Sequence, residues 1–189
     1  MFKAKRRTVV TTAAAVFVLL VVALVVTVVT QGSGAASDNM VAYPVGQRPV
    51  APDFTATSLT GRPINFASYR GKIVLLNVWG SWCGPCRGEG QTLKYLDEQY
   101  GAEGVAFLGD DIEDTPTNAL SFLRGVGITY PSVNDSNGAV EQLLSLAVPI
   151  SGTPTTLVID KTGHIAGLID GPVTYPDVTT LLRDAAVTQ

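Results

Sequence analysis

The most constraining feature of this chain is an almost entirely apolar stretch, residues 73–79, that ends just before two cysteines three positions apart, Cys83 and Cys86. Strands covered on both faces of a sheet have nearly continuous apolar runs of this kind. The spacing of the apolar residues that follow predicts a helix that begins near Cys83 and ends near Tyr100. The chain is therefore expected to place both cysteines at the junction between a buried strand and a helix.

Strands and helices continue to alternate along the rest of the C-terminal part. Apolar runs predict strands, whereas capping residues followed by a helical apolar period predict helices. A mixed central sheet flanked by helices, an α/β fold, accounts for this order. The expected elements are a β-hairpin formed by 54–59 and 64–66, strands at 105–108, 155–159 and 164–169, and helices at 116–124, 138–146 and close to the C-terminus.

The N-terminal part contains a second apolar stretch, residues 8–29, in which only four threonines are polar. A helix of this length spans the roughly 30 Å hydrocarbon core of a membrane. Four basic residues within 1–7 place that end in the cytoplasm and the rest of the chain outside. The alternative is a cleaved signal peptide, although its apolar region is normally only about 7 to 15 residues long. We therefore expect a single-pass protein of the cell membrane with an extracytoplasmic domain, or a secreted protein if the segment is cleaved.

Composition divides the remaining chain into a linker and one domain. Residues 30–49 are rich in Gly, Ser, Ala, Asn and Pro without an apolar period, which predicts a flexible linker. Residues 50–189 are long enough for a single core. The whole chain has 13 basic and 16 acidic residues; without the four N-terminal basic residues, nine remain against 16, a net charge of −7. Such a domain repels phosphate backbones, so nucleic acid is not an expected partner.

The two cysteines have the placement required for thiol–disulfide exchange. The N-terminus of a helix offers unpaired N–H groups and a positive dipole end, which favour a thiolate at Cys83. Cys86 lies one turn further on, close enough to attack a mixed disulfide. Gly84 adds no bulk beside the sulfur atoms, and Pro85 suits the first turn of a helix. We expect Cys83 to be the nucleophile and Cys86 the resolving thiol.

Two other interpretations of the cysteine pair remain open at this point. A structural disulfide is common in exported proteins, but so small a loop restricts the unfolded chain little. A metal site needs two further ligands, and none has suitable spacing in a sequence with one histidine. We therefore expect neither a bound metal nor another cofactor. The acidic residues Asp110, Asp111, Glu113 and Asp114 are interpreted as loop residues ahead of a helix N-terminus rather than as a cation site.

Three segments resemble the thioredoxin superfamily, and in particular its membrane-tethered TlpA/ResA branch. They are VLLNVWGSWCGPCRGE, PDFTATSLTGRPINFASYRGK before it and GTPTTLVIDKTGHIAG after it. The resemblance covers nearly all of residues 50–189. It implies a thioredoxin fold with an N-terminal β-hairpin extension and a protein-disulfide oxidoreductase that acts outside the cytoplasm. Several members of this branch reduce apocytochrome c for haem attachment.

The resemblance also implies roles for individual residues. Cys83 and Cys86 match the redox-active pair, and Trp82 would cover their disulfide. Pro154 matches a cis-proline that faces the disulfide and presents the backbone of Thr153 to an extended substrate strand. From the residues alone, the favoured interpretation of Pro154 is a trans proline that opens a strand.

Glu89 matches an acidic residue that several members carry three positions after the second cysteine. Because three residues make nearly one helical turn, its carboxylate could lie beside Cys86 and accept or relay a proton. The alternative is a solvated carboxylate on the helix surface. Asn77 is a departure, since cytoplasmic thioredoxins have a buried aspartate six residues before the first cysteine, and an amide cannot titrate.

The absence of a third cysteine determines which partners are expected. Every electron must pass through an intermolecular disulfide, so the partners are exported protein thiols or disulfides and, as the resemblance implies, an integral-membrane redox partner. The Gly-Pro dipeptide between the cysteines favours a reductant, with an oxidant that forms disulfides as the alternative. A copper chaperone using His164 is a further alternative. A peroxidase on this fold would need a Thr-x-x-Cys centre, which is not present.

Overall fold

Strand β4 (Val74–Trp79) is the centre of the fold, and all six of its residues are buried. The computed structural model describes residues 38–187. β4 runs parallel to β5 (Ala106–Ile112) on one side and antiparallel to β7 (Thr155–Ile159) on the other. The apolar stretch before the cysteines is therefore a central strand, as predicted.

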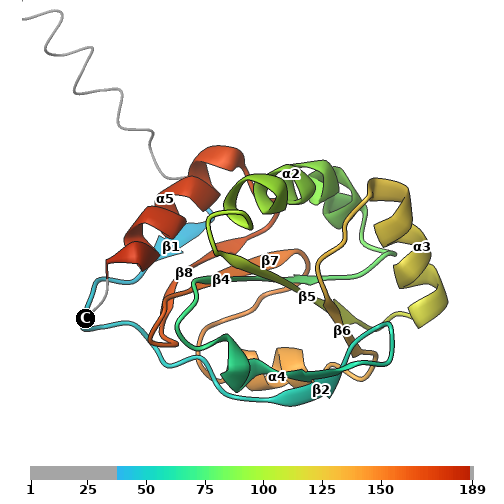
Figure 1. Cartoon of the computed structure of the whole chain (residues 1–189), viewed down its shortest axis with the longest axis horizontal. Helices are drawn as coiled ribbons and strands as arrows, with labels where there is room; N and C mark the ends of the chain where they lie inside the picture. Colours follow the sequence, from blue (N-terminus) through green and yellow to red (C-terminus); the bar gives the residue numbers. More distant parts are fainter. Residues whose placement is uncertain (1–37, 188–189) are drawn as a thin grey trace, which may run out of the picture. The chain divides into compact units, whose positions relative to one another are not determined.

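Six strands form the main sheet, in the order β1-β8-β7-β4-β5-β6 (Figure 1). β6 (Ser132–Asp135) continues the parallel half beside β5, whereas β8 (Ile165–Asp170) is antiparallel to both of its neighbours. β1 (Met40–Ala42) closes the other edge. The predicted mixed sheet is confirmed, but β1 and β6 were not predicted, because strands of three and four residues are too short for a clear alternation.

Helices and a hairpin cover the two faces of this sheet (Figure 1). The predicted hairpin and helices are all present, within a few residues of their expected ends. One face is covered by α2 (Gly84–Tyr100) and α5 (Tyr175–Ala186), with α3 (Pro116–Val126) packed beside α2. The other face carries α4 (Ala139–Ser145), the hairpin of β2 (Thr55–Thr57) and β3 (Pro63–Asn65), and the short 3₁₀ helix η1 (Phe66–Tyr69).

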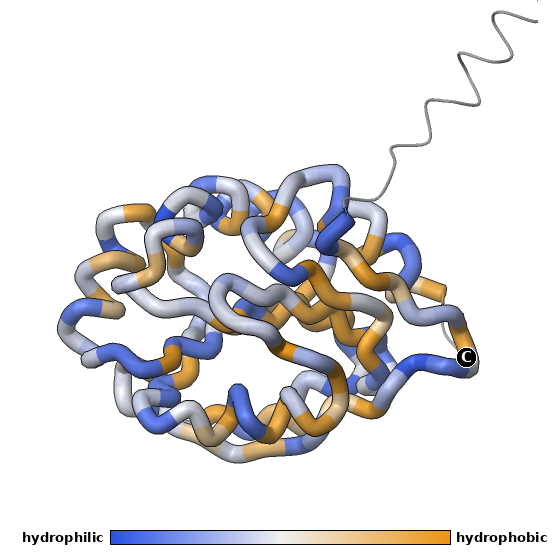
Figure 2. The backbone as a smooth tube through the Cα atoms, turned by 180° about the vertical axis from the view of Figure 1, so that it is seen from behind, coloured by the Kyte–Doolittle hydropathy of each residue, from blue (hydrophilic) through white to orange (hydrophobic). Residues whose placement is uncertain are grey.

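The core has two layers because alternate residues of β4 point to opposite faces. Leu76 packs with residues of α4 and the hairpin, and Leu75 packs with residues of α2 and α5. Figure 2 shows these hydrophobic stretches along strands in the interior. Burying one such leucine contributes about 1.5 to 3 kcal/mol. The two layers hold the C-terminal end of β4, and with it the start of α2, in a fixed position.

Residues 38–49 correct the predicted linker. Met40 in β1 pairs with Ile169 in β8, and the buried side chain of Arg48 forms a 2.9 Å ion pair with Asp160. The linker prediction is therefore wrong for 38–49, and the folded domain begins before residue 50. The error arose because a short edge strand and a single arginine resemble a polar linker in composition.

The predicted apolar span, residues 8–29, lies outside the residues that the structure describes. Within 38–187, none of the helices combines the length and the apolar character that crossing a membrane requires. The span and its alternative, a cleaved signal, stay predictions.

Candidate active site

Cys83 and Cys86 are joined by a disulfide at the N-terminal end of α2. Cys83 is the N-cap residue, and its Sγ accepts a hydrogen bond from the backbone N–H of Cys86 at 3.1 Å. Pro85 lies in the first turn, where its missing N–H costs no intrahelical hydrogen bond. In the reduced protein the same N–H and the helix dipole would favour a thiolate at Cys83.

The second element of the site is the loop that precedes β7. The peptide bond between Thr153 and Pro154 is cis, as the resemblance implies. The carbonyl oxygen of Thr153 lies 3.6 Å from Sγ of Cys83. A backbone segment therefore stands directly beside the sulfur that would form a mixed disulfide.

Glu89 forms the third element, and it is buried rather than solvated, with 3% of its surface exposed. Its Oε1 accepts a hydrogen bond from Nδ2 of Asn77 at 3.0 Å, and its Oε2 accepts one from the N–H of Val173 at 2.8 Å. Asn77 also donates to Oγ1 of Thr156 at 3.0 Å. The alternative of a surface carboxylate is thus wrong.

Burial decides the protonation of Glu89. Loss of hydration raises the pKa of its carboxyl group to about 7, although the hydrogen bonds from Val173 and Asn77 act in the opposite direction. A group with this pKa exchanges protons readily near neutral pH. A buried acid on the same helix as Cys86 is therefore equipped for proton transfer.

Comparison with known proteins agrees with this geometry. Residues 47–167 match the AhpC/TSA family. The thiol-disulfide oxidoreductase ResA of Geobacillus thermodenitrificans is 37% identical over 128 residues, which are 68% of this chain and 71% of that protein. The chain belongs to the AhpC/TSA family of the thioredoxin superfamily.

Solved structures place this member among thioredoxin-like folds. A DsbF homologue from Corynebacterium diphtheriae is 33% identical with a TM-score of 0.70, and the match covers 79% of this chain and 95% of that one. A secreted thiol-disulfide isomerase from Corynebacterium glutamicum is 31% identical with a TM-score of 0.73, covering 82% and 96%. With its disulfide at the start of α2, this family member is a thiol–disulfide oxidoreductase.

Two hydrogen-bond partners in the active site were not predicted from the sequence. Thr156 and the backbone of Val173 complete the hydrogen bonding around Asn77 and Glu89. A signal for Thr156 existed, because a polar residue in a buried strand normally has a hydrogen-bond partner. Val173 contributes only its backbone, and no side-chain pattern can predict such a contact.

Trp82 and Gly84 lie at the surface around the disulfide. The indole of Trp82 is 54% exposed, and its Nε1 donates to the carbonyl of Ile112 at 3.2 Å. A Cβ on Gly80 would come within 2.5 Å of this ring, so glycine allows the indole to fold back onto the chain. Gly84 has open space around it.

Two of the four acidic residues predicted for a loop ahead of a helix differ from that prediction, whereas Glu113 and Asp114 do lie between β5 and α3. Asp110 and Asp111 lie inside β5, not in a loop, and their carboxyl oxygens have no hydrogen-bond partner among residues 38–187. Burial, then repulsion from Asp135, raises the pKa of Asp110 well above its usual range. Burial, then repulsion from Asp114, raises the pKa of Asp111 to about 8. At neutral pH the neutral form of Asp111 is therefore favoured.

His164 does not join the site. It follows the turn before β8, and its Nδ1 lies 2.8 Å from the hydroxyl of Thr162. Within the described part of the chain, no group of three or more His, Cys, Asp and Glu side chains is arranged to hold a metal ion.

Proposed function

We propose that this oxidoreductase acts outside the cytoplasm as a reductant of disulfides in exported proteins, apocytochrome c among them. The observation that carries the proposal is the combination of Cys83 at the start of α2 with a buried carboxyl group, Glu89, on the same helix. The Gly-Pro dipeptide between the cysteines supports the reducing direction. The apolar stretch 8–29 supports the location, with the domain tethered to the membrane or released by cleavage.

The reaction follows from the positions of the two sulfur atoms. In the dithiol form, the Cys83 thiolate attacks a substrate disulfide, forms a mixed disulfide and releases one substrate thiolate, which takes up a proton. Cys86 then loses its proton and attacks Sγ of Cys83, which releases the second substrate thiol. Two electrons pass to the substrate, and its two thiolates take up one proton that Cys86 gave up and one from the solvent. Because the chain has only two cysteines, a separate dithiol partner must reduce them again, and we propose that this partner is bound to the membrane.

Glu89 is proposed as the base that accepts the proton of Cys86. We expect Glu89→Gln to slow resolution of the mixed disulfide at pH 8 at least about tenfold, because only a carboxylate can accept that proton. The wild-type rate should rise with an apparent pKa of about 7, and this rise should vanish in the variant. The pH profiles of Cys86 alkylation and of single-turnover resolution measure the effect. The control is Glu98→Gln, which changes an exposed glutamate of the same helix paired with Lys94; a Glu89→Gln profile equal to that of the control would refute the role.

The same substitution separates this role from a structural one. The pKa of Glu89 is higher in the folded protein than its ordinary value of 4.5, so the folded state binds the proton more tightly. The resulting stabilisation is complete below pH 4.5 and is lost as the pH rises through 7. The amide introduced by the substitution can donate to Asn77 once the Asn77 side chain turns its oxygen toward it and toward Thr156. We therefore expect Glu89→Gln to be slower in resolution but more stable at pH 8, by about 2 to 3 kcal/mol in urea unfolding.

For the direction of electron flow, the competing proposal is that the protein acts as an oxidant. The N–H of Cys86 that bonds Sγ of Cys83 would stabilise the thiolate, and a stabilised reduced form makes an oxidant. Thiol trapping of residues 38–189 in dithiothreitol and glutathione buffers measures the reduction potential. A value near about −270 mV is expected for a reductant, and one near about −120 mV would identify an oxidant.

A further inference from the structure

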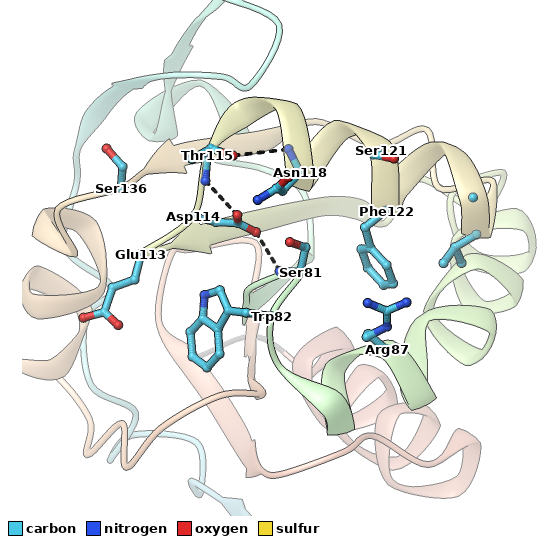
Figure 3. A pocket seen from close by; sticks show the side chains of 12 residues that line it. Ser81, Trp82, Arg87, Glu113, Asp114, Thr115, Asn118, Ser121, Phe122 and Ser136 are labelled. Atoms are coloured by element: carbon cyan, nitrogen blue, oxygen red, sulfur yellow. Dashed lines mark hydrogen bonds between the residues drawn. The ribbon is translucent and has the colours of Figure 1, made fainter.

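A groove open to solvent adjoins Trp82 on the side of α3 (Figure 3). Its walls come from the loop before α2, from α2 itself, from the turn after β5, from α3 and from Ser136 after β6, and its volume is about 1260 Å³. Pockets for small ligands typically hold about 300 to 1,000 Å³ and are mainly apolar. This groove is larger and is lined by many polar residues, so it suits an extended polypeptide better than a small molecule.

The position of the groove relates it to the reaction. Trp82 lines the groove and directly precedes Cys83, whereas Thr153 does not line it. A substrate whose cysteine is joined to Cys83 therefore meets two separate surfaces, the carbonyl of Thr153 and the groove beyond Trp82. Because Trp82 and Cys83 are consecutive residues, the groove is adjacent to the residues that flank the target cysteine.

Arg87 gives one end of the groove a free positive charge. It is the only lysine or arginine among the lining residues. Its guanidinium carbon lies 6.0 Å from the centroid of the Phe122 ring. Within residues 38–187, the N–H groups of this guanidinium make no hydrogen bond or ion pair. A guanidinium with free donors binds a carboxylate well.

The acidic residues of the groove differ in their availability. Both carboxylate oxygens of Asp114 accept backbone hydrogen bonds, from Ser81 at 2.8 Å and from Thr115 at 2.7 Å, so Asp114 serves as part of the wall (Figure 3). Glu113 lies at the end away from Arg87. Its φ of 51° is left-handed, which is found at no other non-glycine residue between 38 and 187. Left-handed backbone of this kind is frequent at ligand-binding sites, and the carboxylate of Glu113 would repel acidic ligands from this end.

We propose that this groove binds the polypeptide segment beside the target cysteine, and that Arg87 selects segments with an Asp or Glu close to that cysteine. Arg87 is four residues after Cys83 on α2, about 6 Å along the helix axis. Two residues of extended chain cover about 6.6 Å, which places the acidic side chain two residues from the cysteine. The inference rests on the exchange reaction proposed above and adds its substrate preference.

Peptides with one cysteine, capped as a mixed disulfide with 2-mercaptoethanol, test this preference. Glu, Gln or Lys is placed two residues from the cysteine, on either side, and the second-order rate with the reduced protein is measured. On one side we expect the Glu peptide to react about fivefold faster than the Gln peptide, and the Lys peptide to be slowest. Arg87→Glu should invert this order. The matched control, Arg124→Glu, changes an exposed arginine of α3 that does not line the groove and should keep the wild-type order.

A second variant tests the shape of the groove. Gly125 lines it, and a Cβ at this position would have no neighbour within 4 Å. Gly125→Phe should therefore fill the groove without disturbing α3, slow all peptides several-fold and leave the reduction of hydroxyethyl disulfide unchanged.

The outcomes separate this inference from the proposed function. If peptide charge has no effect, or Arg87→Glu does not invert the order, the groove proposal is overturned while turnover of hydroxyethyl disulfide still supports exchange. If hydroxyethyl disulfide is not reduced at all, the exchange reaction itself fails. A preference of the wild type for oxidised glutathione over every peptide, lost in Arg87→Glu, would mean a small-molecule occupant and would also overturn the proposal.

Discussion

A Cys86→Ser variant is expected to accumulate a covalent complex with its protein substrates, whereas a Cys83→Ser variant is not. Cys83 is the N-cap of α2, and its sulfur receives the N–H of Cys86 and lies beside the carbonyl of Thr153. In Cys86→Ser the mixed disulfide on Cys83 has no intramolecular thiol to resolve it. In Cys83→Ser the attacking thiolate is missing. Both variants should lose turnover by about a thousandfold or more, as expected when one member of a catalytic pair is removed.

Non-reducing electrophoresis and mass spectrometry of the trapped complex measure this difference. The Cys83→Ser/Cys86→Ser double variant is the control for non-covalent association. Exposure alone does not distinguish the two cysteines, because 4% of Cys83 and 3% of Cys86 is exposed. The assignment depends on the N-cap position. Trapping by Cys83→Ser and not by Cys86→Ser would reverse the two roles.

The strand–cysteine–helix unit could be predicted because its signals are local. The apolar run corresponds to β4, and the helix predicted from Cys83 to Tyr100 corresponds to α2. Both could be predicted because burial on two faces and N-capping depend on a few consecutive residues. Thr115 followed by Pro116 likewise marked the start of α3. Features of this kind depend little on the rest of the chain.

What could not be predicted depends on contacts between distant segments. The environment of Glu89 is built from Asn77 on β4, Thr156 on β7 and the backbone of Val173 before α5. No spacing in the sequence indicates that these segments meet, so a buried acid could not be told from a solvated one. The sequence predicts a loop for Asp110 because acidic residues are favoured ahead of a helix N-terminus, and nothing local indicates that this carboxyl group is buried in β5. Glu89 and Asp110 are thus buried by contacts with distant segments, although acidic residues are usually exposed.

Arg48 lies in the segment that composition predicts to be a linker, yet among the substitutions considered its removal should have the largest effect on stability. Its side chain is 2% exposed and that of its partner Asp160 is fully buried. Arg48 also donates to the carbonyls of Val187 at 2.9 Å and Asp184 at 2.7 Å, at the end of α5. It therefore connects the segment before residue 50 to the C-terminal helix and to the turn before β8.

Arg48→Ala is expected to lower the free energy of unfolding by about 3 to 5 kcal/mol, because it removes the positive charge beside the buried carboxylate of Asp160 and leaves the carbonyls of Val187 and Asp184 without this donor. Arg70→Ala is the matched control, since its 2.8 Å pair with Asp53 is equally short but largely exposed and should contribute about 0 to 1 kcal/mol. Urea unfolding of residues 38–189 measures both variants. The two ion pairs are about equally short, so a large difference between the variants would show the combined effect of burial and of the carbonyl hydrogen bonds that only Arg48 makes. Equal, small losses would mean that residues 38–49 contribute little to the folded domain in solution, as a linker would.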